Sequence, residues 1–148
     1  MKYLPRIADM VLKERLAAFG AVLIEGPKWT GKTTTAMQQA QSILQLQDPD
    51  RRDDNLATAA TMPSLLLKGK QPRLIDEWQD APTLWDAVRI AVDKSGGLPG
   101  QYILTGSNTV DKDKIYHSGT GRITRMKMYP MSLWESGDSS GEISLKEL

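Results

Sequence analysis

The stretch that decides the fold is AVLIEGPKWTGKTTTA, residues 21–36. It opens with an apolar run typical of a buried strand and passes through a loop framed by Gly26 and Gly31. It then continues without Gly or Pro in a segment that suits a helix. From Gly26 to Thr33 the loop fits the pattern G-x-x-x-x-G-K-[ST]. A strand, a glycine-framed loop and a helix in this order predict a phosphate-binding loop.

The residue types in this loop suit a nucleoside triphosphate. Glycine lets the backbone approach an anion closely, and the amides of the loop and of the first helical turn point toward phosphate oxygens. We expect Lys32 to reach the β- and γ-phosphates and the hydroxyl of Thr33 to hold Mg²⁺. Trp29 is expected to pack over the loop. The predicted nucleotide-binding residues are Gly26, Pro27, Lys28, Trp29, Thr30, Gly31, Lys32, Thr33 and Thr34.

The composition limits the class of protein. The 148 residues are 40% hydrophobic and 25% charged, which suits one domain with its own core. The net charge of +1 does not indicate a nucleic-acid or membrane partner. The lack of cysteine excludes disulfides, zinc–thiolate sites and thiol catalysis. The first 20 residues have no unbroken apolar stretch like that of a signal peptide or membrane span, so we expect a cytoplasmic protein.

The rest of the chain alternates between strand and helix patterns. Strands are expected at 21–25, 43–47, 73–77, 101–108 and 122–130, and helices at 7–19, 32–40, 51–60, 63–67 and 81–97. This alternation predicts an α/β fold, with a mainly parallel sheet covered on both faces. We divide the single domain into an N-terminal helix (residues 1–20), a nucleotide-binding core (21–134) and a polar tail (135–148).

A second informative segment is LIDEWQD, residues 74–80. An apolar strand that ends in Asp76 places a carboxylate at the carboxyl edge of the sheet, where ligands bind in such folds. We expect Asp76 to hold Mg²⁺ through its water shell and Glu77 to polarise a water that attacks the γ-phosphate. The alternative is that the two acids only end the strand and cap the next helix. We assign that capping role to Asp80 instead.

The acidic pair also separates classes of nucleotide enzyme. Asp76 is not followed by Gly three residues later and the chain has no N-K-x-D segment, so ATP is favoured over GTP. Small-molecule kinases usually do without a water-activating Glu, because their nucleophile is a substrate hydroxyl; hydrolysis is therefore favoured. DEWQD also resembles a motif of superfamily-one helicases, but such a helicase needs two cores and 148 residues supply only one, so we set this alternative aside unless the chain is a fragment.

Polar residues at the ends of the last two strands are further candidates. In ILTGSN, residues 103–108, we favour Ser107 and then Thr105 as a sensor of the attacking water or the γ-phosphate, against the alternative of turn formation. Arg122 is our candidate arginine finger for a neighbouring subunit, with Arg125 left open; the alternative is a charged sheet edge. His117 is the only histidine, and we assign it no catalytic role.

Together, GAVLIEGPKWTGKTTTA, PRLIDEWQ, YILTGS and HSGTGRI resemble the AAA-type P-loop ATPase core of bacterial and archaeal ATP-binding proteins. The resemblance implies a three-layer ASCE-type sandwich with strand order 5-1-4-3-2 and the phosphate loop at residues 26–33. It also implies an acidic pair at Asp76 and Glu77, a sensor at Ser107 and a candidate arginine at Arg122. Proteins of this kind usually carry a C-terminal domain of unknown function, so we expect the tail to lead to a lid or such a domain.

Two functions remain open from the sequence. The first is an ATPase that uses ATP and Mg²⁺ and that forms a homo-oligomer, in which one subunit supplies an arginine to the next. The second is a nucleotide-dependent switch with little turnover of its own. The presence of Glu77 favours the ATPase. The need for an arginine from a neighbouring subunit favours the switch for a chain on its own.

Overall fold

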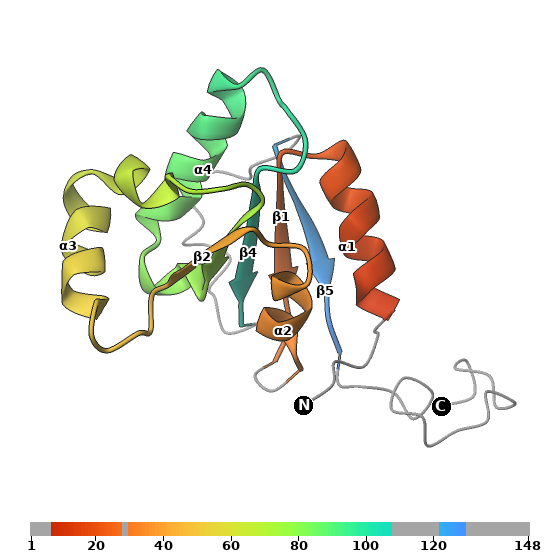
Figure 1. The fold of residues 1–148 in the computed structure, drawn as a ribbon, viewed down its shortest axis with the longest axis horizontal. Helices are drawn as coiled ribbons and strands as arrows, with labels where there is room; N and C mark the ends of the chain where they lie inside the picture. The colour runs from red at the N-terminus through yellow and green to blue at the C-terminus, as the bar shows by residue number, and fades with distance from the viewer. Residues whose placement is uncertain (1–6, 28–29, 108–121, 130–148) are drawn as a thin grey trace, which may run out of the picture.

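Five parallel strands form one sheet in the order β2-β3-β4-β1-β5 (Figure 1). The computed structural model describes residues 7–27, 30–107 and 122–129. The strands are β1 (Ala21–Glu25), β2 (Ser42–Gln45), β3 (Arg73–Asp76), β4 (Tyr102–Gly106) and β5 (Ile123–Lys127). Counted from the other edge, this is the expected order 5-1-4-3-2, and the α/β prediction is confirmed.

Helices cover both faces of the sheet and give three layers. They are α1 (Ile7–Ala18), α2 (Lys32–Met37), α3 (Arg52–Thr61) and α4 (Thr83–Lys94), with short 3-10 helices η1 (Pro63–Leu67) and η2 (Trp78–Asp80). One layer is formed by α1, which packs on β1 and β5, and α2, which packs on β3 and β4. The other contains α3, η1 and α4, which pack against one another.

Most elements are shorter than the sequence predicts, and the early ends of α2 and β3 are the two that shape the region around the phosphate loop. The helix α2 ends at Met37, and the chain passes through a turn before β2. The strand β3 ends at Asp76, because Glu77 adopts a φ of 57°, a left-handed conformation that cannot continue a strand. Glu77 therefore begins a tight turn into η2 instead of closing the strand.

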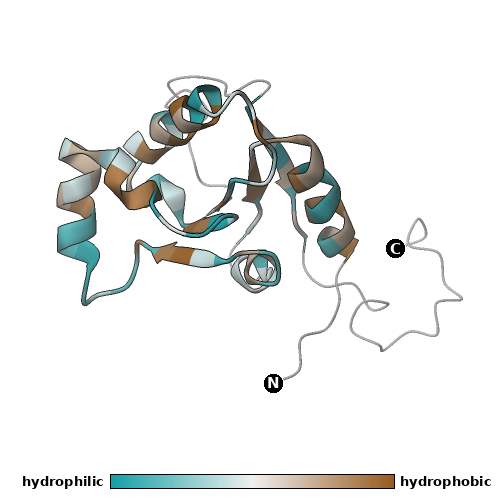
Figure 2. Cartoon of the chain, turned by 45° about the horizontal axis from the view of Figure 1, so that its top comes forward, coloured by the Kyte–Doolittle hydropathy of each residue, from teal (hydrophilic) through white to brown (hydrophobic). Residues whose placement is uncertain are grey.

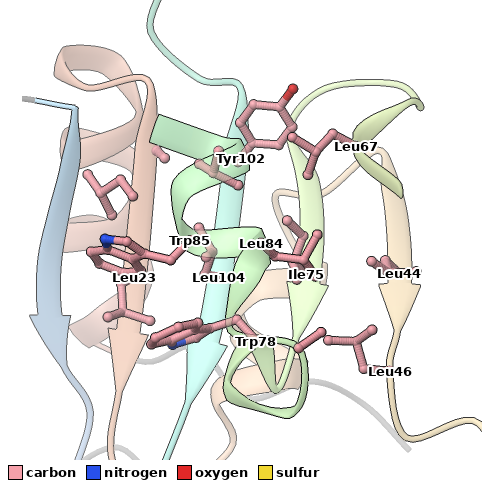
Figure 3. Packing of buried hydrophobic residues seen from close by; sticks show 14 of the residues in the cluster. Leu23, Leu44, Leu46, Leu67, Ile75, Trp78, Leu84, Trp85, Tyr102 and Leu104 are labelled. Carbon is pink, nitrogen blue, oxygen red and sulfur yellow. The ribbon is translucent and has the colours of Figure 1, made fainter. Parts of the chain in front are cut away.

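The alternation of side chains along each strand divides the core into two clusters. Val22, Ile24 and Ile103 belong to the cluster with Leu12 and Leu16 of α1. The opposite cluster contains, among others, Leu23, Ile75, Leu104, Leu84, Trp78 and Trp85 (Figure 3). Both faces of the central strands are thus apolar, as expected for a parallel sheet between two helical layers. In Figure 2 the hydrophilic first turn of α3 lies at the outside of the fold.

The two tryptophans of the second cluster pack against each other at a tilted angle. Their ring centroids are 5.0 Å apart and the ring planes are inclined at 41°. Trp78 belongs to η2 and Trp85 to α4, so their contact fixes the turn after β3 against the helix that follows it (Figure 3).

Parallel pairing brings the ends of all five strands to common edges. The loop after β1 and the turn after β3 both leave at the carboxyl edge, together with the end of β4. Lys28, Trp29, His117 and the tail 135–148 lie outside the described residues. Among the described residues, no helix combines the length and apolar character needed to span a bilayer.

We expect the core substitution Leu104→Ala to lower the free energy of unfolding by about 2–5 kcal/mol, because it leaves a cavity in the middle of the sheet. Leu104 is fully buried, whereas Leu98 is 61% exposed. Urea denaturation of Leu104→Ala and of the control Leu98→Ala measures the difference. Equal losses in the two variants would contradict the placement of Leu104 in the core.

Candidate functional site

The loop between β1 and α2 is constrained by its two glycines. A Cβ on Gly26 would lie only 2.5 Å from the carbonyl oxygen of Met128, so no other residue fits there without moving the backbone. Gly31 has φ 88° and ψ 22°, a left-handed conformation that glycine adopts readily, and α2 begins at the next residue. The side chain of Thr30 donates to the carbonyl of Pro27 at 3.0 Å and braces the loop.

Lys32 lies across this loop. Its side chain is 5% exposed, and Nζ donates to the carbonyl oxygens of Gly26 at 2.7 Å and Pro27 at 2.8 Å. Burial lowers the pKa of the Lys32 ammonium from its usual value, and the nearby carboxylates of Glu77 and Asp76 oppose that shift. The structure therefore brings the predicted phosphate-binding lysine to both predicted acids.

Asp76 is held by hydroxyls from two other elements. Thr33 of α2 donates its Oγ1 proton to Asp76 Oδ1 at 2.6 Å, and Thr105 of β4 donates to the same oxygen at 2.7 Å. Thr105 is fully buried, and its Oγ1 also accepts a hydrogen bond from the backbone N–H of Glu77 at 3.0 Å. One hydroxyl thus fixes the carboxylate of the first acid and the backbone of the second.

The donor set around Asp76 fits Mg²⁺ bound together with phosphate groups. Mg²⁺ prefers oxygen ligands and is usually held by one or two carboxylates plus substrate phosphates. Thr33 and Asp76 supply a hydroxyl and a carboxylate in mutual contact. In the described part of the chain, no group of three or more His, Asp or Glu residues could form an all-protein metal site.

The carboxylate of Glu77 accepts a hydrogen bond from a residue of the turn that follows it. The side-chain amide of Gln79 donates from Nε2 to Glu77 Oε2 at 2.5 Å and to Ser107 Oγ at 3.2 Å. Ser107, our preferred sensor, therefore reaches the acidic pair through Gln79, whereas Thr105, our second choice, contacts it directly. The sequence assigns no role to Gln79, because nothing in its position along the chain shows that η2 turns its amide back onto Glu77.

The prediction that Asp80 caps the next helix is wrong. Asp80 is the last residue of η2, and its Oδ2 accepts hydrogen bonds from Gln47 at 3.1 Å and Arg52 at 3.3 Å. The N-cap of α4 is Pro82, which makes no side-chain capping bond. The extra turn of η2 carries the Asp80 carboxylate toward the connection between β2 and α3.

The two candidate arginines belong to β5 and the residue before it. The backbone carbonyl of Arg122 accepts from Ala21 N–H at 3.2 Å, and its Nε donates to Asp93 Oδ1 at 2.6 Å. Arg122 therefore lies at the amino edge of the sheet, five residues or about 17 Å along β1 from Gly26, the start of the phosphate loop. The Arg125 guanidinium lies 5.3 Å from the Trp85 ring centroid and 3.8 Å from Glu25 Oε1.

Comparison with known proteins agrees with this geometry. A family model described as an AAA domain matches residues 18–136, a range that contains the loop, the acidic pair, the end of β4 and both arginines. No curated protein matches the chain. Together with the parallel sheet, the family match indicates a P-loop domain that binds a nucleotide.

We expect Thr105→Val to lower the free energy of unfolding by about 1–3 kcal/mol, because the valine leaves the half-buried N–H of Glu77 without its acceptor. Thr105→Ser keeps both hydrogen bonds and should retain more of this polar contribution. Urea denaturation of both variants measures the effect, with Thr58→Val as the control for an exposed helical hydroxyl bonded to Asp54 O. A loss no larger in Thr105→Val than in Thr58→Val would contradict the bridging role.

Proposed function

Because the chain belongs to the AAA domain family, we propose that it binds ATP together with Mg²⁺ and hydrolyses the bond to the γ-phosphate. The observation that carries the proposal is the 2.6 Å hydrogen bond between Thr33 and Asp76. It joins the start of α2, which follows the loop, to the acid at the end of β3. A Mg²⁺·ATP complex needs a hydroxyl and a carboxylate side by side at this position.

In this proposal the loop residues 26–34 bind the phosphates, and Trp29 keeps its expected place over the loop. The ammonium of Lys32 exchanges its bonds to the Gly26 and Pro27 carbonyls for bonds to phosphate oxygens. Thr33 and Asp76 hold the metal ion, which supplies positive charge to the phosphates when bound.

Glu77 is the proposed acceptor for the proton of the attacking water. The water oxygen forms a bond to the γ-phosphorus as the bond to the bridging oxygen breaks, and that bridging oxygen leaves with ADP. Ser107 and Thr105 at the end of β4 are the proposed residues that sense this event, since both are linked to the acidic pair.

A second candidate function is a nucleotide-dependent switch with little turnover alone. The position of Arg122 favours it, because that side chain lies at the far edge of the sheet from its own phosphate loop. If Arg122 acts in hydrolysis, it does so at the nucleotide of a neighbouring copy. The side chains of its ion pair with Asp93 are exposed at 43% and 42%, and exposed pairs contribute only about 0–1 kcal/mol, so the arginine can leave Asp93 at little cost.

We expect Lys32→Ala to weaken ATP binding about tenfold or more, since a hydrogen bond to a charged group contributes about 1.5–3 kcal/mol. Glu77→Gln should keep ATP affinity and lower phosphate release to a small residual rate. Titration with a fluorescent ATP analogue and a phosphate-release assay measure the two quantities, with Lys94→Ala as an exposed-lysine control. Unchanged ATP affinity in a folded Lys32→Ala protein would refute the nucleotide site.

ATP binding without phosphate release in the wild type, at low and high protein concentration, would favour the switch.

If Arg122 acts in trans, activity per chain should rise with protein concentration, and Arg122→Ala should be inactive yet still bind ATP. Mixing Arg122→Ala with Glu77→Gln should restore turnover, because the first variant keeps its own Glu77 and the second offers Arg122. An arginine finger contributes about 10³–10⁵ in rate, so even rare mixed contacts are detectable in a phosphate-release assay. Arg89→Ala, which removes another arginine paired with an aspartate of α4, is the control. A mixture no more active than the sum of its parts, with an active wild type, would rule out the finger.

A further inference from the structure

The turn after β3 lies directly on the end of β4. A Cβ on Gly106 would lie 2.9 Å from Trp78 Nε1 and 3.0 Å from Gln79 Oε1, so the glycine is what allows η2 to approach the strand. The residues on either side of Gly106 complete the contact through Thr105 to the Glu77 backbone and through Ser107 to Gln79. The two segments are packed too closely to move independently.

Gln79 occupies the centre of this contact. Its Nε2 is shared between Glu77 Oε2 and Ser107 Oγ. The orientation of the amide is fixed chemically, because a carboxylate only accepts hydrogen bonds and must face the NH₂ group. Its other end, Oε1, is buried and has no hydrogen-bond partner within the part of the chain that the structure describes. A buried acceptor without a partner is costly, and the charge-assisted bond to Glu77 offsets that cost.

Glu77 needs such a support. Its backbone is in the left-handed region, at φ 57° and ψ 56°, which is unfavourable for a residue with a long side chain. A free glutamate side chain samples several rotamers, whereas a group that accepts a proton in catalysis must stay within hydrogen-bond reach of its water. Holding the carboxylate through Oε2 leaves Oε1 to face that water.

We propose that Gln79 is a positioning residue that orients the Glu77 carboxylate and couples it to Ser107 at the end of β4. This inference rests on the proposed hydrolysis, in which Glu77 accepts the proton. It adds a physical link between the residue that activates the water and the strand end that senses the phosphate. A change at Ser107 reaches Glu77 through one side chain.

The kinetic test is Gln79→Met, which keeps the length of the side chain and removes the donor. We expect kcat to fall about ten- to hundredfold, as for loss of a hydrogen bond to a charged group, with ATP affinity and KM changed less than about twofold. In the Glu77→Gln background, where only the slow residual phosphate release is followed at high protein concentration, the same change should have no further effect, because Gln79 acts through Glu77. The control is Gln47→Met, since Gln47 also binds a carboxylate of η2, that of Asp80, and should leave kcat unchanged.

A second measurement does not require turnover. In ¹⁵N NMR spectra of the full chain, the side-chain amide signals of Gln79 are identified by their loss in Gln79→Met. We expect them to move in Glu77→Gln and in Ser107→Ala and to stay in place in Gln47→Met. A wild type that binds ATP without releasing phosphate would refute the hydrolysis, while these spectra still decide whether Gln79 joins Glu77 to Ser107.

Three results would overturn the inference. The first is a set of Gln79 amide signals that responds to neither Glu77→Gln nor Ser107→Ala. The second is a loss of ATP affinity in Gln79→Met as large as its loss of kcat, which would indicate general damage to the site. The third is a full additional loss of rate when Gln79→Met is added to Glu77→Gln.

Discussion

The carboxylate of Asp76 is the group on which the arrangement of the carboxyl edge depends. It lies at the end of β3, and the hydroxyls of Thr33 and Thr105 donate to the same oxygen from α2 and β4. Hydrogen bonds to an ionised acceptor are about twice as strong as neutral ones, so this oxygen ties three elements together. The Lys32 ammonium, nearby and buried, adds an attraction of opposite charge. In the proposed function, the same contacts hold the metal–nucleotide complex.

The close approach of neighbouring chain segments at two glycines is the second constraint at the carboxyl edge of the sheet. Gly26 brings the start of the phosphate loop against the chain at Met128, and Gly106 brings η2 against the end of β4. In both places a Cβ would overlap with atoms of another segment. The loop and the acidic turn are therefore held by packing as well as by hydrogen bonds, which suits a site whose groups must stay in position while the ligand changes.

The two edges of the sheet have different chemical character. The carboxyl edge carries the loop, the two acids and the hydroxyls of β4, whereas the amino edge carries the ion pair of Arg122 with Asp93. A strand of five residues separates them, which is farther than an arginine side chain reaches. Within the proposed function, Arg122 therefore acts on the nucleotide of a neighbouring subunit and not on that of its own chain. In that proposal, the balance between hydrolysis and a nucleotide-dependent switch depends on assembly.

The sequence by itself determined the local chemistry. The pattern from Gly26 to Thr33 and the Asp76–Glu77 pair are each local in sequence, so their residue types and spacing predicted the loop and the acids, and the alternation of strand and helix patterns predicted the parallel α/β fold. The strand order came from the resemblance to AAA-type ATPases. Only the tertiary structure decided which side chains meet. The contacts of Thr105 with Asp76, of Gln79 with Ser107 and of Asp80 with Arg52 join residues 28 or 29 positions apart. They depend on strand register and on one left-handed residue, which no local pattern encodes.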